Sequence, residues 1–377
     1  VPFGKTSIIV GINNAGKSTI VEALRLLSLI TNRYQNLNYK KPPSELGLPS
    51  SCHVVSPSLE NISLNFDTAF HLLGNPPSII RASFSGGETV DIYIARNKHI
   101  YGVITDNKRK NIKYKYEANQ ASLPQIHILP QVAPLDRKEK ILTENYVKEH
   151  ISTDISHLHF RNQLRIMKEE YEKFIKLAAQ TWPGLEILEL AGADGMPGEP
   201  LGLLVKDGEF VAEASWMGHG LQVWLQAIWF VARTPKEATV VLDEPDVYLH
   251  PDIQRKLVKL ISATYPQSVI TTHSIEIMSE VDPSEILIVD KKIAKSHYAD
   301  DYPTMKKLID HLGSAHNVNL ARISVTKKFV IIEGDDLDIL GIFHRKIFPN
   351  SVLPLSSIPH LPLGGWGGWD YAIGSRL

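Results

Sequence analysis

Hydrophobic residues group into short runs that alternate with polar stretches along this chain, the pattern of a mixed α/β protein. The apolar run Ser7–Val10 predicts a buried strand, and the segment after it has apolar positions at helical spacing. Two later runs, Val240–Leu242 and Val269–Thr271, predict buried parallel strands joined by a helix that starts near Pro251. The longer run Leu221–Arg233 predicts a buried helix.

Between these segments, two regions have patterns of their own. Hydrophobic and polar residues alternate over residues 59–117, which predicts an antiparallel β lobe. Residues 136–181 are charged and helical in spacing, so we expect a helical insertion there, followed by a polar loop at 191–200. The strands expected in the lobe are Ile62–Phe66, Ile79–Phe84, Val90–Ile94, Tyr101–Thr105 and Lys113–Tyr116.

The pattern predicts two domains. The first covers residues 1–290 and ends after a short strand at Ile286–Val289. Residues 291–326 are interpreted as a linker, and residues 327–377 as the beginning of a second domain. The strands and helix expected in the second domain are Phe329–Ile332, Ile339–Ile347 and Ser356–Leu363.

Composition narrows the possible partners. The net charge is −1 over 377 residues, so the chain as a whole does not attract nucleic acid. One local basic patch, Lys108–Lys110 with Lys113 and Lys115, could contact DNA, although a solvated hairpin explains it equally well. The single cysteine, Cys52, fits a reducing cytoplasm, and no apolar stretch is long enough to predict a membrane span. Because the chain starts at Val1 without an initiator Met, we expect both ends to be cut relative to the natural protein.

A glycine-rich loop, GINNAGKST, lies between the first strand and the first helix. This order is that of a phosphate-binding loop, in which N–H groups at a helix N-terminus surround the phosphates of a nucleotide. Lys17 would reach the β- and γ-phosphates, and the Ser18 hydroxyl would bind Mg²⁺. The residues expected to bind ATP here are Gly11, Asn13, Asn14, Ala15, Gly16, Lys17, Ser18 and Thr19.

Three further motifs suit ATP hydrolysis. Two acids end the strand before Pro245: Asp243 would hold Mg²⁺ through water, and Glu244 would activate the attacking water. His273 ends the next apolar strand, where its imidazole could donate to the γ-phosphate. Ser215 and Gly218 lie at the start of the buried helix, where a hydroxyl and N–H groups could contact a phosphate.

Together these motifs resemble the ABC-type ATPases of the SMC, RecF and OLD (overcoming lysogenization defect) group. The matching segments, in the family's order, are GINNAGKST, SWMGHGLQ, VVLDEPDVYLHP and ITTHS. The resemblance implies an ATP-sandwich homodimer, in which Ser215 and Gly218 of one subunit contact ATP held by Lys17 of the other. It also implies a glutamine loop, for which the best candidate is Gln131 and the competitors are Gln125 and Gln35.

The second domain opens with a buried strand that ends in Glu333 and an acidic cluster. Carboxylates at a strand tip can bind Mg²⁺ or Mn²⁺ for phosphodiester cleavage, but an acidic helix cap explains the same residues. An ABC ATPase followed by this motif resembles the OLD family, in which a TOPRIM (Rossmann-like) nuclease domain follows the ATPase. The resemblance implies that Glu333 is a metal ligand and catalytic acid/base.

The chain departs from the TOPRIM pattern at two points. The family usually has an Asp four residues after the Glu, but Leu337 stands there, so Asp336 or Asp338 would be the second ligand. No Asp-x-Asp strand follows before Leu377, and we expect it beyond that residue.

The leading hypothesis is an ATP-regulated, metal-dependent DNA endonuclease in the cytoplasm. The resemblance implies a role in anti-phage defence like that of the Gabija or retron-associated nucleases, together with a partner protein, RNA or DNA. The competing hypothesis is an SMC- or RecF-like ATPase clamp that does not cleave DNA. A transporter ATPase is a third option, disfavoured because the signature lacks Ser-Gly-Gly-Gln.

Overall fold

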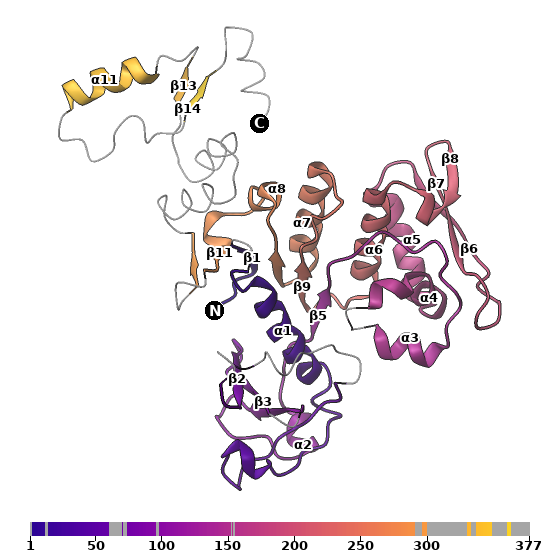
Figure 1. Ribbon diagram of the computed structural model, residues 1–377, viewed down its shortest axis with the longest axis vertical. Coiled ribbons are helices and arrows are strands. Elements are labelled where there is room, and N and C mark those ends of the chain that lie inside the picture. Colours follow the sequence, from indigo (N-terminus) through magenta and orange to yellow (C-terminus); the bar gives the residue numbers. More distant parts are fainter. Residues whose placement is uncertain are drawn as a thin grey trace. The chain divides into compact units, whose positions relative to one another are not determined.

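The computed structural model describes residues 2–11, 14–59, 70, 74–95, 98–151, 153, 155–290, 296–299, 330–332, 337–348 and 360–362. The chain divides into two compact units, one formed by residues 1–16 with 272–377 and the other by residues 17–271. The division falls inside the glycine-rich loop, between Gly16 and Lys17. Helices and strands occur in both units, so the α/β prediction is confirmed (Figure 1).

Three parallel strands form the centre of the larger unit. They are β10, β9 and β5, and they comprise Gln267–Thr271, Thr239–Asp243 and Ile126–Leu129 in that order. Thr271 pairs with Asp243, and Leu129 pairs with Leu242, so the carboxyl ends of all three strands lie at the same edge. The two parallel strands expected from the apolar runs are therefore confirmed.

Helices α1 (Lys17–Thr31), α6 (His219–Arg233) and α7 (Pro251–Thr264) belong to the same unit. In α6 every residue from Leu221 to Ala232 is buried, as its apolar sequence predicts. Pro251 is the first residue of α7, where a missing N–H costs nothing, and the imidazole of His250 accepts the N–H of Asp252 at 3.4 Å.

The far end of α1 is joined to β5 and to the antiparallel lobe. The side-chain amide of Asn32 donates to the carbonyl of Ile126 at 2.8 Å and accepts that residue's N–H at 2.8 Å. A Cβ atom on Gly102 would lie 2.4 Å from the Cδ1 of the buried Ile30, so a larger residue in this strand would force the Ile30 side chain to move.

The antiparallel lobe contains three of the predicted strands, β2 (Ser78–Ser83), β3 (Thr89–Ile94) and β4 (Ile100–Thr105). The strand expected at Ile62–Phe66 lies outside the described residues. The strand expected at Lys113–Tyr116 is wrong, because helix α2 (Lys115–Ala118) begins there. The Glu117 carboxylate accepts the N–H groups of Lys113 and Tyr114, at 2.7 and 3.3 Å, and so caps this helix.

The helical insertion is confirmed by three helices within residues 136–181. They are α3 (Glu144–His150), α4 (Phe160–Ile166) and α5 (Lys168–Thr181). The rings of Phe174 in α5 and Trp229 in α6 pack edge to face, with centroids 6.0 Å apart. An antiparallel sheet that the pattern did not predict follows, formed by β6 (Leu185–Ala191), β7 (Gly202–Asp207) and β8 (Phe210–Glu213). The expected loop at 191–200 connects β6 to β7.

In the smaller unit, strand β11 (Ile286–Ile288) pairs in parallel with β1 (Thr6–Val10) and antiparallel with β12 (His297–Tyr298). The short helix α8 (Ile275–Met278) precedes β11. Strand β12 lies inside the stretch interpreted as a linker, so at least these two residues belong to a sheet.

A strand, a helix and a second strand follow in the same unit. Strand β13 (Val330–Ile332) pairs in parallel with β14 (His360–Pro362), and α11 (Leu337–Ile347) connects them in sequence. A strand, a helix and a strand therefore lie where the sequence predicts them within residues 327–377, with β14 shorter than expected. Among the residues that the structure describes, no helix has both the length and the apolar character needed to cross a bilayer.

Candidate nucleotide site

Lys17 lies close to the acids that follow β9. It is the first residue of α1, and its side chain is buried. Burial lowers the pKa of Lys17, whereas the negative charges of Glu244, Asp243 and Asp246 act in the opposite direction. The larger unit therefore places the expected phosphate-binding ammonium beside the acids expected to bind Mg²⁺ and activate water.

The first turn of α1 is open to a ligand. Ser18 and Thr19 are exposed, and the turn contains no acidic residue. Free N–H groups and the positive end of the helix dipole favour an anion at this position. Ser18 is thus available for the role that the sequence predicts.

The loop before α1 has the backbone of a tight anion-binding turn. Asn14 and Gly16 have positive φ angles of 61° and 111°, and backbone turns that bind anions contain left-handed residues of this kind. A Cβ atom on Gly11 would lie 2.4 Å from the carbonyl oxygen of Val289, so glycine is required there. Ala15 is buried, and Asn13 lies outside the described residues.

Thr271 contacts both acids that the sequence predicts at this site. Its hydroxyl donates to the Oδ1 of Asp243 at 2.6 Å, and its carbonyl accepts the N–H of Glu244 at 3.0 Å. Glu244 has a φ of 46°, a left-handed conformation that is strained for a residue with a side chain. The sequence analysis missed Thr271, although its place one strand away from Asp243 was a usable signal.

These groups fit a Mg²⁺ ion bound together with a nucleotide. Mg²⁺ in such sites takes one or two protein oxygens and completes its shell with phosphate oxygens and water. Asp243 Oδ2 and the Ser18 hydroxyl can supply the protein oxygens. No cluster of three or more His, Cys, Asp or Glu side chains suited to a metal occurs within the described part of the chain.

His273 belongs to the smaller unit, as does the glycine-rich loop up to Gly16. The N–H of Thr272 donates to the carbonyl of Ile9 at 3.1 Å, which places His273 next to the carboxyl end of β1, where the loop starts. The Thr272 hydroxyl accepts the N–H of Ser274 at 2.9 Å, and the Ser274 hydroxyl caps α8. His273 therefore lies between two hydrogen-bonded residues, Thr272 and Ser274, beside the loop that it is expected to serve.

Gly218 and Ser215, the two residues expected to contact a partner's nucleotide, differ in exposure. Gly218 is exposed and caps the N-terminus of α6. Ser215 is buried, its N–H donates to the Oε2 of Glu213 at 2.8 Å, and its hydroxyl donates to the same oxygen. The predicted contact through Ser215 therefore requires that its hydroxyl leave Glu213.

Glu213 in turn binds a buried arginine from the helical insertion. The guanidinium of Arg161 donates to the Oε1 of Glu213 from Nε at 2.9 Å and from Nη2 at 2.7 Å. Its Nη1 donates to the Oε2 of Glu139 at 3.1 Å, and Arg161 is only 1% exposed. Asn162 completes the network by donating to the Oε1 of Glu139 at 2.8 Å.

The structure separates the three glutamines proposed for the glutamine loop. Gln131 follows β5 at the carboxyl edge of the sheet, where Asp243 also lies, and it is exposed. Gln125 precedes β5, and its carbonyl accepts the N–H of Thr239 at the opposite edge. Gln35 follows the far end of α1, a 15-residue helix about 22 Å long. Position therefore favours Gln131.

The acids expected at the nuclease site, Glu333 and Asp336, lie outside the described residues. The elements that flank them are β13 and α11, so the chain passes from a strand to a helix at these acids. Leu337, which stands at the family's Asp position, is the first residue of α11.

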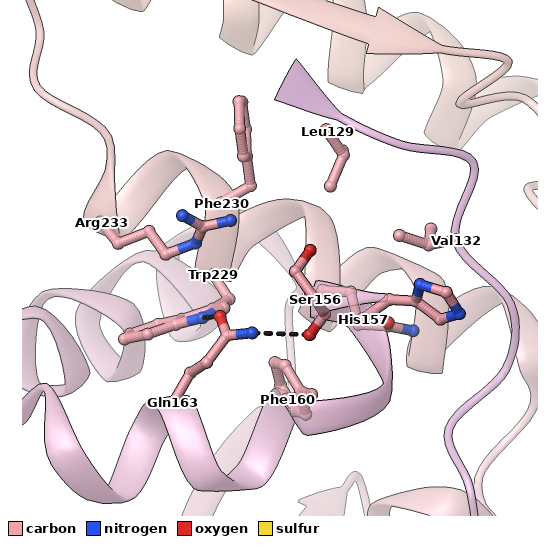
Figure 2. Close-up of a pocket in the computed structure, with 10 residues that line it drawn as sticks. Leu129, Val132, Ser156, His157, Phe160, Gln163, Trp229, Phe230 and Arg233 are labelled. Atoms are coloured by element: carbon pink, nitrogen blue, oxygen red, sulfur yellow. Dashed lines mark hydrogen bonds between the residues drawn. The ribbon is translucent and has the colours of Figure 1, made fainter. Parts of the chain in front are cut away.

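A separate small pocket, of about 20 Å³, lies between the helical insertion and α6 (Figure 2). The Gln163 amide accepts the indole N–H of Trp229 at 2.7 Å and donates to the carbonyl of Ser156 at 2.6 Å. Arg233 also lines it, and its buried Nε atom has no hydrogen-bond partner among the residues described. No lining residue belongs to the glycine-rich loop or to the acidic strand end, so this pocket is not the nucleotide site.

Comparison with known protein families gives one match. Residues 105–279 match the family described as "AAA domain, putative AbiEii toxin, Type IV TA system". The matched segment contains Ser215, Gly218, Asp243, Glu244 and His273, and the match supports a P-loop ATPase of the ABC type. No curated protein matches the chain.

Solved structures that resemble the chain are SMC head domains. One, bound to the C-winged helix domain of ScpA, is 16% identical with a TM-score of 0.44, covering 79% of this chain and 91% of that one. The Smc head of Pyrococcus furiosus, bound to the C-terminal domain of ScpA, is 14% identical with a TM-score of 0.41, and the match covers 82% of this chain and 94% of that one. The SMC head of Thermotoga maritima is 13% identical with a TM-score of 0.38, and the match covers 76% of this chain and 87% of that one. Because these TM-scores are all below 0.5, the similarity to SMC heads does not support the ATPase assignment further.

Proposed function

We propose that this chain binds ATP with Mg²⁺ at the Lys17 site and hydrolyses it in a homodimer that closes around two nucleotides. The observation that carries the proposal is the placement of Lys17 beside Asp243 and Glu244, at the exposed first turn of α1. In the cleavage step, Glu244 accepts a proton from a water molecule as that water attacks the γ-phosphorus, the bond to the β,γ-bridging oxygen breaks, and ADP leaves. Lys17 and the N–H groups of the loop stabilise the negative charge on the phosphate oxygens.

The metal supplies charge neutralisation on the β- and γ-phosphates when it is bound. Asp243 and Ser18 would hold it, with Thr271 fixing the carboxylate of Asp243. Gly218 of the opposite subunit would complete the site with its N–H group. Gln131 and His273 would contact the metal shell and the γ-phosphate, respectively, from the loops that carry them.

Two substitutions test this function. Lys17→Ala should abolish binding of a fluorescent ATP analogue, whereas Lys236→Ala, which removes an exposed lysine of the same unit, should not. Glu244→Gln should stop turnover and trap an ATP-bound dimer in analytical ultracentrifugation, with the exposed Glu237→Gln as its control. Normal ATP affinity in Lys17→Ala would exclude the loop as the nucleotide site.

We further propose that the ATPase controls a metal-dependent DNA endonuclease, as in anti-phage defence. The parallel β13–α11–β14 unit supports this proposal, because a strand followed by acids and a helix is the beginning of a TOPRIM-like fold. Glu333 would then bind Mg²⁺ or Mn²⁺ and move a proton during phosphodiester cleavage, with Asp336 as a second ligand.

Plasmid cleavage in Mg²⁺ or Mn²⁺, with and without ATP, tests the nuclease. Wild-type protein should cleave, and Glu333→Ala should lose cleavage while it retains ATPase activity. Cleavage that persists in Glu333→Ala would exclude this residue as a ligand. Active ATPase without cleavage in either protein would favour the clamp, which holds DNA and does not cut it.

A further inference from the structure

The turn after β4 presents three cations to solvent. Its residues Lys108, Arg109 and Lys110 are all exposed. The carboxylate of Asp106 accepts the N–H groups of Lys108 and Lys110 at 2.9 and 2.7 Å, so it fixes the turn. Arg109 adopts a left-handed φ of 61°, which a tight turn requires. The backbone of this turn is therefore fixed by hydrogen bonds, and its exposed cationic side chains can contact a ligand.

Two exposed tyrosines follow this turn. Tyr114 and Tyr116 are 52% and 63% exposed, although large aromatic side chains usually bury much of their surface. Their rings are nearly parallel, with planes 11° apart and centroids 5.7 Å apart. The ring of His53 lies against Tyr114 at 5.8 Å. Two stacked aromatic rings on the surface are not explained by a merely solvated hairpin.

The backbone beneath these rings is anchored at two points. Ile112 is buried, and its N–H donates to the carbonyl of Ile104 at 2.8 Å. The side chain of Asn111 accepts the N–H of His53 at 2.7 Å and donates to its carbonyl at 3.1 Å. The tyrosines therefore project from a fixed base, so little conformational entropy is lost when a ligand stacks on them.

The segment of residues 106–117 contains five cations and two carboxylates, and one of these, Glu117, accepts the hydroxyl of Tyr116 at 3.2 Å. Lys113 and Lys115 flank Tyr114 and add to the three cations of the turn, whereas the chain as a whole has a net charge of −1. The carboxylates between residues 106 and 117 are those of Asp106 and Glu117, and both accept backbone N–H groups. Cations that surround stacked aromatic rings are the chemistry of a site for phosphates linked to flat bases.

We propose that this basic and aromatic surface, formed by Lys108, Arg109, Lys110, Tyr114, Lys115 and Tyr116, binds single-stranded nucleic acid. The cations contact backbone phosphates, and bases stack on the outer faces of the tyrosines. Single strands are favoured over duplexes because only an unpaired base has a face free to stack. This inference deepens the proposed function, since it names the nucleic acid that the ATPase engages and the surface that holds it.

Fluorescence anisotropy with labelled 20-nucleotide dT and U strands and a 20-base-pair duplex tests the proposal, without ATP or divalent metal. Wild-type protein should bind a single strand more tightly than the duplex, and the two single strands show whether DNA or RNA is preferred. Tyr114→Ala with Tyr116→Ala should weaken single-strand binding about tenfold for each lost base contact and leave the salt dependence unchanged. Tyr114→Phe with Tyr116→Phe, which keeps the rings, should bind as wild type.

A triple substitution measures the contribution of the cations of the turn separately from that of the tyrosine rings. Lys108→Ala, Arg109→Ala and Lys110→Ala together should weaken binding and lower the slope of log affinity against log salt by about 2, as expected for three lost phosphate contacts on a single strand. The matched control removes Lys168, Lys173 and Lys176, exposed cations of α5, and should bind as wild type.

Equal single-strand affinity of wild type and the folded double Tyr→Ala variant would overturn the proposal, as would a preference for the duplex. Circular dichroism checks that the variants are folded. Because the assay contains no ATP, its failure would leave the Lys17 site untouched, and Lys17→Ala should bind the single strand as wild type.

Discussion

The hydroxyl of Thr271 donates a 2.6 Å hydrogen bond to the carboxylate of Asp243, across neighbouring parallel strands. Thr271→Val keeps the side-chain shape and removes this donor. We expect ATP turnover to fall about 10–100-fold, because residues that orient a metal ligand have effects of this size. The loss should be partly recovered at high Mg²⁺ concentration, and steady-state ATPase assays over a Mg²⁺ series measure it.

Thr264→Val is the control for that substitution, since the Thr264 hydroxyl donates to the carbonyl of Leu260 within α7, away from Asp243. An unchanged Mg²⁺ requirement in Thr271→Val would show that Asp243 does not depend on this bond.

The buried ion network should dominate the stability of the insertion. Arg161→Met leaves the carboxylates of Glu139 and Glu213 without their cation, so we expect a loss of about 3–5 kcal/mol in the free energy of unfolding. Urea denaturation measures it. Arg81→Met, which breaks the exposed pair with Asp91, should cost much less, because solvent screens that pair. Similar costs for the two variants would contradict the assigned burial of Arg161.

Arg233 should destabilise the fold. Burial lowers its pKa to about 10, so it remains charged at neutral pH, yet its Nε has no partner in the described structure. Removing a buried, unsatisfied donor should raise the free energy of unfolding by about 1–2 kcal/mol in Arg233→Met. Arg33→Met, at an exposed position, should change it little. Differential scanning calorimetry compares the melting temperatures, and destabilisation by Arg233→Met would mean that its apolar stem contributes more than its charge costs.

His127 should make stability depend on pH. Burial, followed by the charge of Arg233, lowers its pKa to about 4, whereas the unfolded value is 6.5. Between these values the unfolded chain binds the proton and the native chain does not, so stability rises as pH increases from 4 to 6.5. The difference corresponds to at most about 3 kcal/mol. Urea unfolding of wild type and His127→Gln at pH 4.5 and 7 should show a smaller pH effect in the variant.

Sequence patterns within a few residues were enough to predict several helices, strands and loops. The apolar run of α6, the Pro251 start of α7 and the glycine-rich loop before Lys17 carry their signals within a few residues. The alternation at Lys113–Tyr116 was misleading, because it has the period of a strand, but the Glu117 carboxylate caps a helix there.

Side-chain pairings between distant segments could not be predicted in this way. Arg161 and Glu213 are 52 residues apart, and neither neighbourhood indicates the other. The hydroxyl of Ser215 was expected to face a nucleotide, and nothing in its own segment reveals that Glu213 accepts it. The sequence likewise left three candidates for the glutamine loop. The structure separates them, because Gln131 lies at the carboxyl edge of the sheet and Gln125 at the opposite edge.

The ion pair between Arg161 and Glu213 restricts how the sequences of related proteins can change. The insertion that carries Arg161 and the segment that carries Glu213 should not change independently, since loss of Arg161 leaves Glu213 without its cation and loss of Glu213 leaves the buried Arg161 with Glu139 alone. Relatives that shorten or replace the insertion should therefore also replace the acid two residues before the serine of SWMGHG. An alignment of such relatives should show the two positions changing together.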